Sequence, residues 1–205
     1  MARHLSAFLL SLFLALFLAL PFAAHAEGTP RDTVQALCDG LLDVMKHSKD
    51  LGFQGRADKL AKVVPVVYDM PAATRATLGV SFSKLSPDEA RQLTDAFQRL
   101  SVASYAEQFD GFEGEHFEVG EARPASTEGS LIVPSRIVTK AGQGTEIDYI
   151  VHQDGGRWKI VDVLLDGTIS QTAVRRSEFV SIFRRDGFPG LMSVLDKKIA
   201  AMGSK

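Results

Sequence analysis

The chain contains a single cysteine, Cys38, so it cannot form an internal disulfide. Its charges nearly cancel, with 23 Lys and Arg against 25 Asp and Glu, which gives no indication of nucleic-acid binding. After residue 26 the only histidines are His47, His116 and His152, too scattered to suggest a metal site. The sequence also lacks a glycine-rich phosphate loop and a Ser-His-Asp order of catalytic residues. We therefore expect a fold held by packing alone, with Cys38 as a small buried hydrophobe.

The one long apolar run lies at the N-terminus, where Ala7 to Phe22 is almost wholly apolar. Ala24-His25-Ala26 then fits the small-x-small pattern of a cleavage site, so we expect residues 1–26 to be a secretory signal peptide. No second apolar run is long enough to span a bilayer, and Cys38 is misplaced for a lipoprotein anchor. Residues 27–205 should form a single soluble, exported domain.

Hydrophobic residues at helical spacing follow two strong helix starts. Thr29 to Asp32 is typical of a capped start with proline at the first position, and it predicts a helix over about 30–48. Ser86 to Glu89 is a capping box that predicts another helix. Between them, a less regular helical stretch at about 56–79 is interrupted by two prolines.

From about His116 the hydrophobic period changes to two, which predicts an antiparallel sheet. Four strands are expected, at 117–119, 131–139, 147–152 and 158–165. Asp154-Gly155-Gly156 closes the last hairpin, and both of its strands carry apolar residues on both faces. Either helices cover both faces, or one face forms the wall of an apolar pocket. Periodicity alone leaves both readings open.

After Gly167 the helical period returns and predicts two closing helices, separated near Gly187, with the second over 190–202. The fold class is therefore α+β, with a helical N-terminal half, a curved four-stranded antiparallel sheet and two C-terminal helices. The first closing helix carries four arginines: Arg175, Arg176, Arg184 and Arg185. A helix turns about 100° per residue, so they cannot share one face. They form either an ordinary solvated surface or a phosphate or docking patch.

The C-terminal third resembles a known family. The residues that carry the resemblance are Trp158 to Val163, Asp166-Gly167, Ile169-Ser170, Arg176-Ser177, Phe179, Ile182, Arg185 to Phe188, Gly190 and Leu191. They are similar to the signature of the MlaC-type family, exported phospholipid-binding components of an ABC lipid-transport system, also called toluene-tolerance auxiliary proteins. Where that family commonly has an aromatic residue, this chain has Arg175, and the departure resembles the hopanoid-associated branch.

The resemblance implies a periplasmic carrier that holds phospholipid or hopanoid chains in an apolar cavity. It implies shuttling between an inner-membrane ABC transporter complex and an outer-membrane lipoprotein complex, by a monomer with lipid as cargo, no cofactor and no catalytic activity. With the strand pattern, it places the lipid tails against Phe97, Tyr105, Phe109, Val133, Ile137, Tyr149, Val151, Trp158, Ile160, Leu164, Phe179 and Phe183. The four arginines are expected to contact the lipid headgroup or the partners.

Two other functions stay open. A small pocketed α+β enzyme of isomerase or hydratase type would use Asp148, His152 or Asp162 as general acid or base. Asp148 and His152 share a strand face but lie about 13 Å apart along it, too far for a direct hydrogen bond. A ligand-free interaction module would instead have a filled core and dock through its basic C-terminal helices.

Overall fold

The computed structural model describes residues 28–204, so the predicted signal peptide at 1–26 lies outside the described residues. The helices are α1 (Pro30–Lys46), α2 (Ser48–Val67), α3 (Met70–Leu78), the 3-10 helix η1 (Gly79–Lys84), α4 (Pro87–Gln108) and α5 (Gln171–Ala201). The strands are β1 (His116–Val119), β2 (Arg123–Pro124), β3 (Ser130–Val133), β4 (Ser135–Val138), β5 (Gly144–Asp154), β6 (Arg157–Leu165) and β7 (Ile169–Ser170). None of the helices described is long and apolar enough to cross a membrane.

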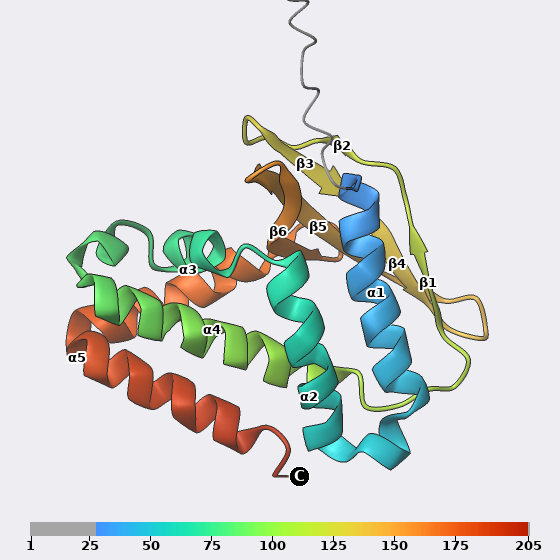
Figure 1. Cartoon of the computed structure of the whole chain (residues 1–205), viewed down its shortest axis with the longest axis horizontal. Helices are drawn as coiled ribbons and strands as arrows, with labels where there is room; N and C mark the ends of the chain where they lie inside the picture. Colours follow the sequence, from blue (N-terminus) through green and yellow to red (C-terminus); the bar gives the residue numbers. More distant parts are fainter. Residues whose placement is uncertain (1–27, 205) are drawn as a thin grey trace, which may run out of the picture.

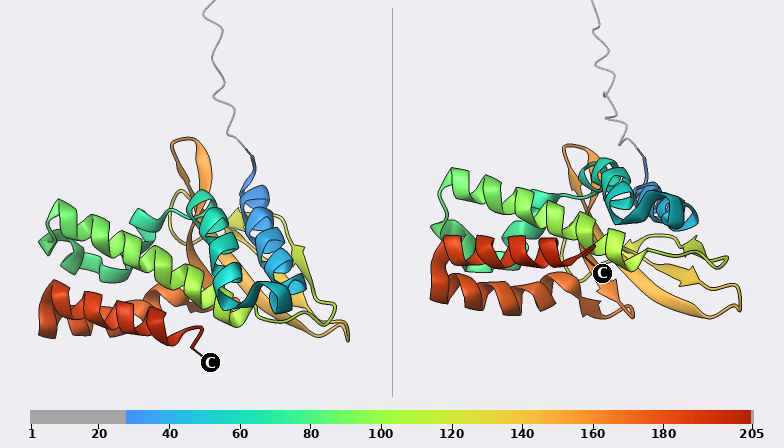
Figure 2. Two further views of the ribbon diagram at one scale, coloured as in Figure 1. Left: turned by 60° about the horizontal axis from the view of Figure 1, so that its bottom comes forward. Right: turned by 90° about the horizontal axis from the view of Figure 1, so that it is seen from below.

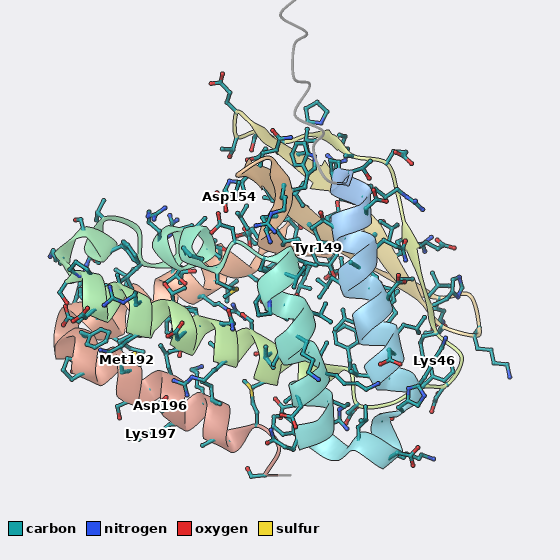
Figure 3. The ribbon with its side chains drawn as sticks, viewed as in Figure 1. Lys46, Tyr149, Asp154, Met192, Asp196 and Lys197 are labelled. Atoms are coloured by element: carbon teal, nitrogen blue, oxygen red, sulfur yellow. The ribbon has the colours of Figure 1, made fainter. Side chains whose placement is uncertain are left out.

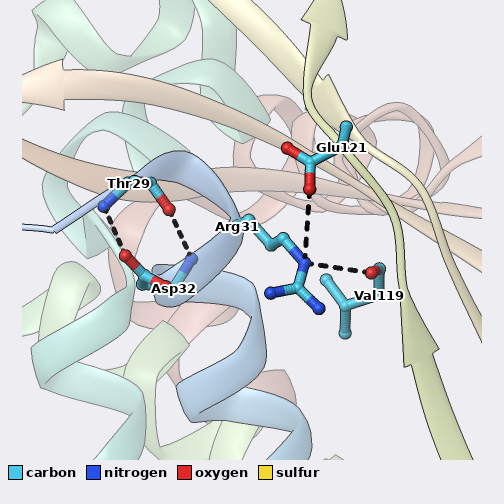
Figure 4. Close-up of polar contacts among 5 residues, drawn as sticks. All are labelled: Thr29, Arg31, Asp32, Val119 and Glu121. Carbon is cyan, nitrogen blue, oxygen red and sulfur yellow. Dashed lines mark hydrogen bonds and ion pairs between the residues drawn. The ribbon is translucent and has the colours of Figure 1, made fainter.

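Helix α1 begins at a reciprocal cap (Figure 4). The backbone N–H of Thr29 donates to Asp32 Oδ2 at 2.8 Å, and the backbone N–H of Asp32 donates to Thr29 Oγ1 at 3.1 Å. Arg31 points to the neighbouring sheet edge, where its Nε donates to the Val119 carbonyl at 3.1 Å and lies 3.8 Å from the Glu121 carboxylate. The first turn of α1 is thereby tied to the end of β1.

Local sequence signals also set the helices that follow. Ser86 and Glu89 form the predicted capping box at the start of α4, with donor–acceptor distances of 2.8 and 3.2 Å. The irregular stretch predicted at 56–79 consists of α2 and α3, but α2 begins at Ser48, earlier than predicted. Pro71 occupies the first turn of α3, where its missing N–H leaves no helical bond unmade, and Pro65 lies in the last turn of α2.

Strand β5 is the centre of an antiparallel sheet. One edge of β5 pairs with β4 and then β3, its other edge pairs with β6, and β1, β2 and β7 extend the sheet. The strand expected over 131–139 is two strands, because Pro134 separates β3 from β4 and has no N–H for the ladder. The sheet therefore has seven strands where four were expected, and two of the additions, β2 and β7, are only two residues long.

The β5–β6 hairpin contains a β-bulge. Ile150 pairs with Asp162 while Val151 pairs with Ile160, so Val161 is an extra residue on β6. A bulge breaks the strict alternation of faces and increases the local twist of the strand.

Beyond the bulge, the odd-numbered residues of β6 lie on the face of the sheet to which the even-numbered residues point before it. Val163 pairs with Tyr149, and Leu165 pairs with Ile147, so these four residues share one face of the sheet. Leu164 pairs with Asp148 on the opposite face. Strict alternation along β6 would place Leu164 on the same face as Ile160, and the bulge moves it to the other face.

The layers are visible in Figures 1 and 2. Helix α1 lies across the sheet, α2 packs beside it, and α4 and α5 run side by side away from the sheet. Tyr149 is labelled in the middle of the molecule in Figure 3, between the sheet and the helices, and is only 1% exposed. The two predicted closing helices are both present: α5 consists of two helical segments that meet at Gly187, whose φ of 68° and ψ of −168° are not helical.

Candidate functional site

A pocket of about 270 Å³ lies between the β5–β6 hairpin and helices α3, α4 and α5. Aromatic and aliphatic side chains form much of its wall, among them Phe97, Leu100, Phe109, Ile147, Val163 and Phe179. The Phe97 ring on α4 meets the Phe179 ring on α5 edge to face, with 5.3 Å between ring centroids. The pocket thus lies between the sheet and a layer of helices, and its wall is more apolar than polar.

The three tyrosines of the chain, Tyr68, Tyr105 and Tyr149, all line this pocket. The hydroxyls of Tyr68 and Tyr105 are hydrogen-bonded to each other. Burial raises the pKa of Tyr105 to about 12 and raises the pKa of Tyr68 and of Tyr149 well above the ordinary tyrosine value. The hydroxyls therefore stay neutral and contribute hydrogen-bonding capacity without negative charge.

One side of the pocket wall is polar. Arg175, near the start of α5, donates from Nη1 to Ser101 Oγ of α4 at 3.3 Å. Glu178 pairs with Lys198 at 2.9 Å across the kink of α5. Thr74 on α3 is fully buried, and its Oγ1 has no hydrogen-bond partner among the residues described. The pocket therefore combines an apolar wall with a cation and an unsatisfied hydroxyl.

The other three arginines lie outside this pocket. Arg176, Arg184 and Arg185 line a separate open groove on the surface, together with Leu78, Gly79, Val80, Ser177, Val180 and Ser181. Arg176 donates from Nε and Nη2 to the Ala76 carbonyl of α3, and Arg185 pairs with Asp186 at 2.7 Å. Val80 is 82% exposed on η1. Of the four arginines that are close together in the sequence, Arg175 thus lines the pocket and the other three line the surface groove.

Comparison with known proteins shows the family. Residues 35–197 match the family model described as MlaC protein. The chain belongs to the MlaC family. The toluene tolerance protein Ttg2D of Pseudomonas putida is 24% identical over 178 residues, which span 85% of this chain and 82% of that protein. The predicted resemblance is confirmed; the assignment to the hopanoid-associated branch remains a prediction.

A solved structure shares the fold. A phospholipid-binding protein from Ralstonia solanacearum, determined in complex with a phospholipid at 1.53 Å resolution, superimposes with a TM-score of 0.74 at 22% sequence identity. The match covers 86% of this chain and 100% of that chain. The predicted α+β class is therefore confirmed as the fold of this MlaC-family protein.

The MlaC pocket brings together five of the twelve residues predicted to contact lipid tails: Phe97, Tyr105, Phe109, Tyr149 and Phe179. The remaining seven do not line it. Val133, Val151, Ile160 and Leu164 are buried elsewhere, while Ile137, Trp158 and Phe183 are partly buried. Alternating hydrophobicity marks burial, but it does not say which helix covers a strand, and α1 packs against β3 and β6 away from the pocket.

The sequence pattern missed part of the pocket wall. Val161, Val163 and Leu165 line the pocket because the bulge reverses the parity of β6. Met70, Thr74 and Thr77 line it from α3, a short helix in which no apolar stripe pointed to a cavity. The sequence of α3 alone does not show that these threonines face a pocket, because that depends on how α3 packs against the sheet and the other helices.

The residues considered as enzymatic acids and bases have other contacts. Asp148 pairs with Arg123 at 3.3 Å, and His152 Nε2 lies 2.8 Å from Asp69 Oδ2 at the cap of α3. Asp162 lines the pocket, but its Oδ1 accepts the backbone N–H of Thr172 at 2.9 Å and anchors the start of α5. Over residues 28–204, no group of three or more His, Cys, Asp or Glu side chains is arranged to hold a metal ion.

Proposed function

We propose that this MlaC-family protein is a periplasmic carrier that binds the hydrocarbon chains of phospholipid, or of a hopanoid, in the pocket beneath the β5–β6 hairpin. It shuttles this cargo between an inner-membrane ABC transporter complex and an outer-membrane lipoprotein complex, as a monomer without catalytic activity. The observation that carries the proposal is the apolar pocket, in a fold shared over 86% of the chain with a protein solved in complex with phospholipid.

The physical need for such a carrier follows from the cost of wetting hydrocarbon. A diacyl lipid has roughly 30 methylenes, and at ~0.8 kcal/mol each their exposure to water costs about 24 kcal/mol. Free lipid therefore crosses an aqueous compartment at a negligible rate. A dry pocket removes this cost for the hydrocarbon chains, whereas a polar headgroup needs polar or hydrated surroundings.

The size of the pocket bears on how the cargo enters. Its volume of about 270 Å³ lies near the lower end of the roughly 300–1,000 Å³ typical of small-molecule sites. Two acyl chains need more space than this. We therefore expect the loaded protein to have a wider pocket, with α3, α4 and α5 displaced relative to the hairpin.

The surface groove is the proposed docking region. Arg176, Arg184 and Arg185 surround the exposed Val80, a combination of basic rim and apolar centre that suits an acidic protein partner. The proposal therefore separates cargo binding, inside the pocket, from partner contact, at the groove.

Lipid extraction tests the function. The mature protein, purified from its native periplasm without detergent, is extracted with organic solvent and the extract analysed by mass spectrometry. Glycerophospholipid in about equal amount to protein supports the phospholipid role, and a pentacyclic triterpenoid supports the hopanoid role. The proposal is overturned if the protein carries no lipid and also takes none up from phospholipid vesicles.

A further inference from the structure

Arg175 is the one cation of the arginine group that faces the interior. It lies near the start of α5, is half-buried and lines the pocket, whereas the adjacent Arg176 is exposed and contacts the Ala76 carbonyl. Since successive residues of a helix differ by about 100° in direction, the two neighbours serve different surfaces. Substitutions at Arg175 and Arg176 can therefore be compared as test and control.

The Arg175 side chain lacks a counterion. Its one hydrogen bond runs from Nη1 to Ser101 Oγ at 3.3 Å, and no carboxylate of residues 28–204 forms an ion pair with it. The two acidic residues of the pocket wall have other partners: Glu178 pairs with Lys198, and Asp162 accepts backbone N–H groups at the start of α5. A guanidinium offers five N–H donors, so most of this donor capacity is unused within the protein.

The surroundings of Arg175 increase the effect of its charge. Ser101 is only 6% exposed, and the field of Arg175 reaches Tyr68 and Tyr105, opposing the rise that burial causes in the pKa of both. Charges interact more strongly where water is displaced by protein. Arg175 is half-buried and has no ion-pair partner among the residues described, so a ligand with negative oxygen atoms would supply the partner that the protein lacks.

The pocket wall also has a neutral polar atom without a partner. Thr74 lines the same pocket from α3, and its buried Oγ1 makes no hydrogen bond with any residue described. An unsatisfied buried hydroxyl costs free energy until a partner arrives. Because Thr74 is fully buried, its hydroxyl becomes available to a ligand only when the pocket widens.

We propose that Arg175 binds the anionic oxygen group of an acyl lipid, phosphodiester or carboxylate, inside the pocket. Ser101 orients the guanidinium from α4, and the planar fork of Arg175 suits two oxygen atoms of one anionic group. This inference rests on the proposed lipid-carrier function and deepens it. The cargo is selected by its negative charge as well as by its hydrocarbon.

The test compares lipids with the same acyl chains. Lipid-free mature protein is titrated with dioleoylphosphatidylglycerol, oleate and dioleoylglycerol, and the bound fraction is measured by native mass spectrometry. Arg175→Gln should weaken phosphatidylglycerol binding by about ten- to a hundredfold, the range for a hydrogen bond to a charged group. Binding of the uncharged dioleoylglycerol should be unchanged. A loss confined to phosphatidylglycerol identifies phosphate as the bound group, and a parallel loss for oleate extends the site to carboxylates.

Two further variants make the test specific. Arg175→Lys keeps the charge without the planar fork, so its loss should be intermediate, while Arg176→Gln should bind all three lipids as wild type does. Equal weakening of charged and uncharged lipid by Arg175→Gln, or no weakening of either anionic lipid, would overturn the inference. A wild-type protein that binds none of the three would instead overturn the carrier function itself.

Discussion

Tyr68, at the end of α2, and Tyr105, on α4, share a hydroxyl–hydroxyl hydrogen bond within the pocket wall. Their ring centroids are 6.5 Å apart, and the Tyr105 ring continues to Phe109 at 6.0 Å. The pair therefore links the end of α2 to α4 within the pocket wall, through two hydroxyl groups that remain uncharged.

The first prediction concerns alkaline pH. Because the pKa of all three tyrosines is raised above the ordinary value of about 10, the folded state keeps protons that the unfolded state loses. Stability is therefore fully present below about pH 10 and falls as pH rises towards about 12, the pKa of Tyr105. Tyrosinate absorbance followed together with circular dichroism should rise only as the helices unfold. Ionisation near pH 10 with intact helices would contradict burial.

A second prediction concerns blocking the pocket. Ala73 lines it from α3, and Ala73→Phe adds a ring to a space of about 270 Å³. The extracted lipid per protein should fall at least several-fold. Ala173→Phe is the control, since Ala173 is exposed on α5 and outside the pocket. The two are compared by mass spectrometry of extracts after circular dichroism has shown both to be folded. Undiminished lipid in the Ala73 variant would place the cargo elsewhere.

A third prediction separates docking from cargo binding. Arg184→Glu reverses a charge in the surface groove, away from the pocket, so bound lipid should remain. Transfer of labelled lipid between the two membrane complexes should slow by about tenfold or more, as expected for a charge reversal in an interface. Raising the salt concentration should reduce the wild-type rate in the same direction. Loss of lipid from this variant would move Arg184 to the headgroup site.

A fourth prediction tests the kink of α5. Gly187 has φ 68° and ψ −168°, a conformation that is essentially restricted to glycine. An added Cβ would lie 3.7 Å from Pro189 Cδ, an ordinary contact, so the cost of Gly187→Ala is backbone strain of about 1–3 kcal/mol. Chemical denaturation should show this loss. Gly111→Ala, where a Cβ meets nothing within 4 Å, should be neutral or slightly stabilising, and equal losses at both positions would contradict the explanation.

Local chemistry predicted the starts of α1 and α4 and the break in α5, but not the start of α2 at Ser48. The caps at Thr29 and Ser86 and the break at Gly187 each depend on a few neighbouring residues, so the sequence contains all the information needed. Pro134 lies inside the single strand expected at 131–139, but the split into β3 and β4 also depends on both halves pairing with one edge of β5.

The pocket was harder to predict because it depends on which layers meet. Val151 and Ile160 are as apolar and as buried as a cavity wall would be, yet they lie outside the pocket. Arg175 and Arg176 look equivalent in the sequence, and only the packing of α5 on α4 gives one of them an interior position. The spacing of hydrophobic residues predicts which residues are buried. Whether a buried residue packs in the core or lines a cavity depends on contacts between segments that are distant in the sequence.

Val161, the extra residue of the bulge, could be deleted without shifting the register of the β5–β6 hairpin. The residues on either side of it keep their partners on β5, so deleting Val161 would preserve every remaining neighbour pair and the identity of each face. The deletion would remove the extra twist that the bulge gives the strands, together with the Val161 side chain in the pocket wall. Removing or adding one residue at this point would therefore change the twist of the hairpin, while the order of the strands in the sheet stays the same.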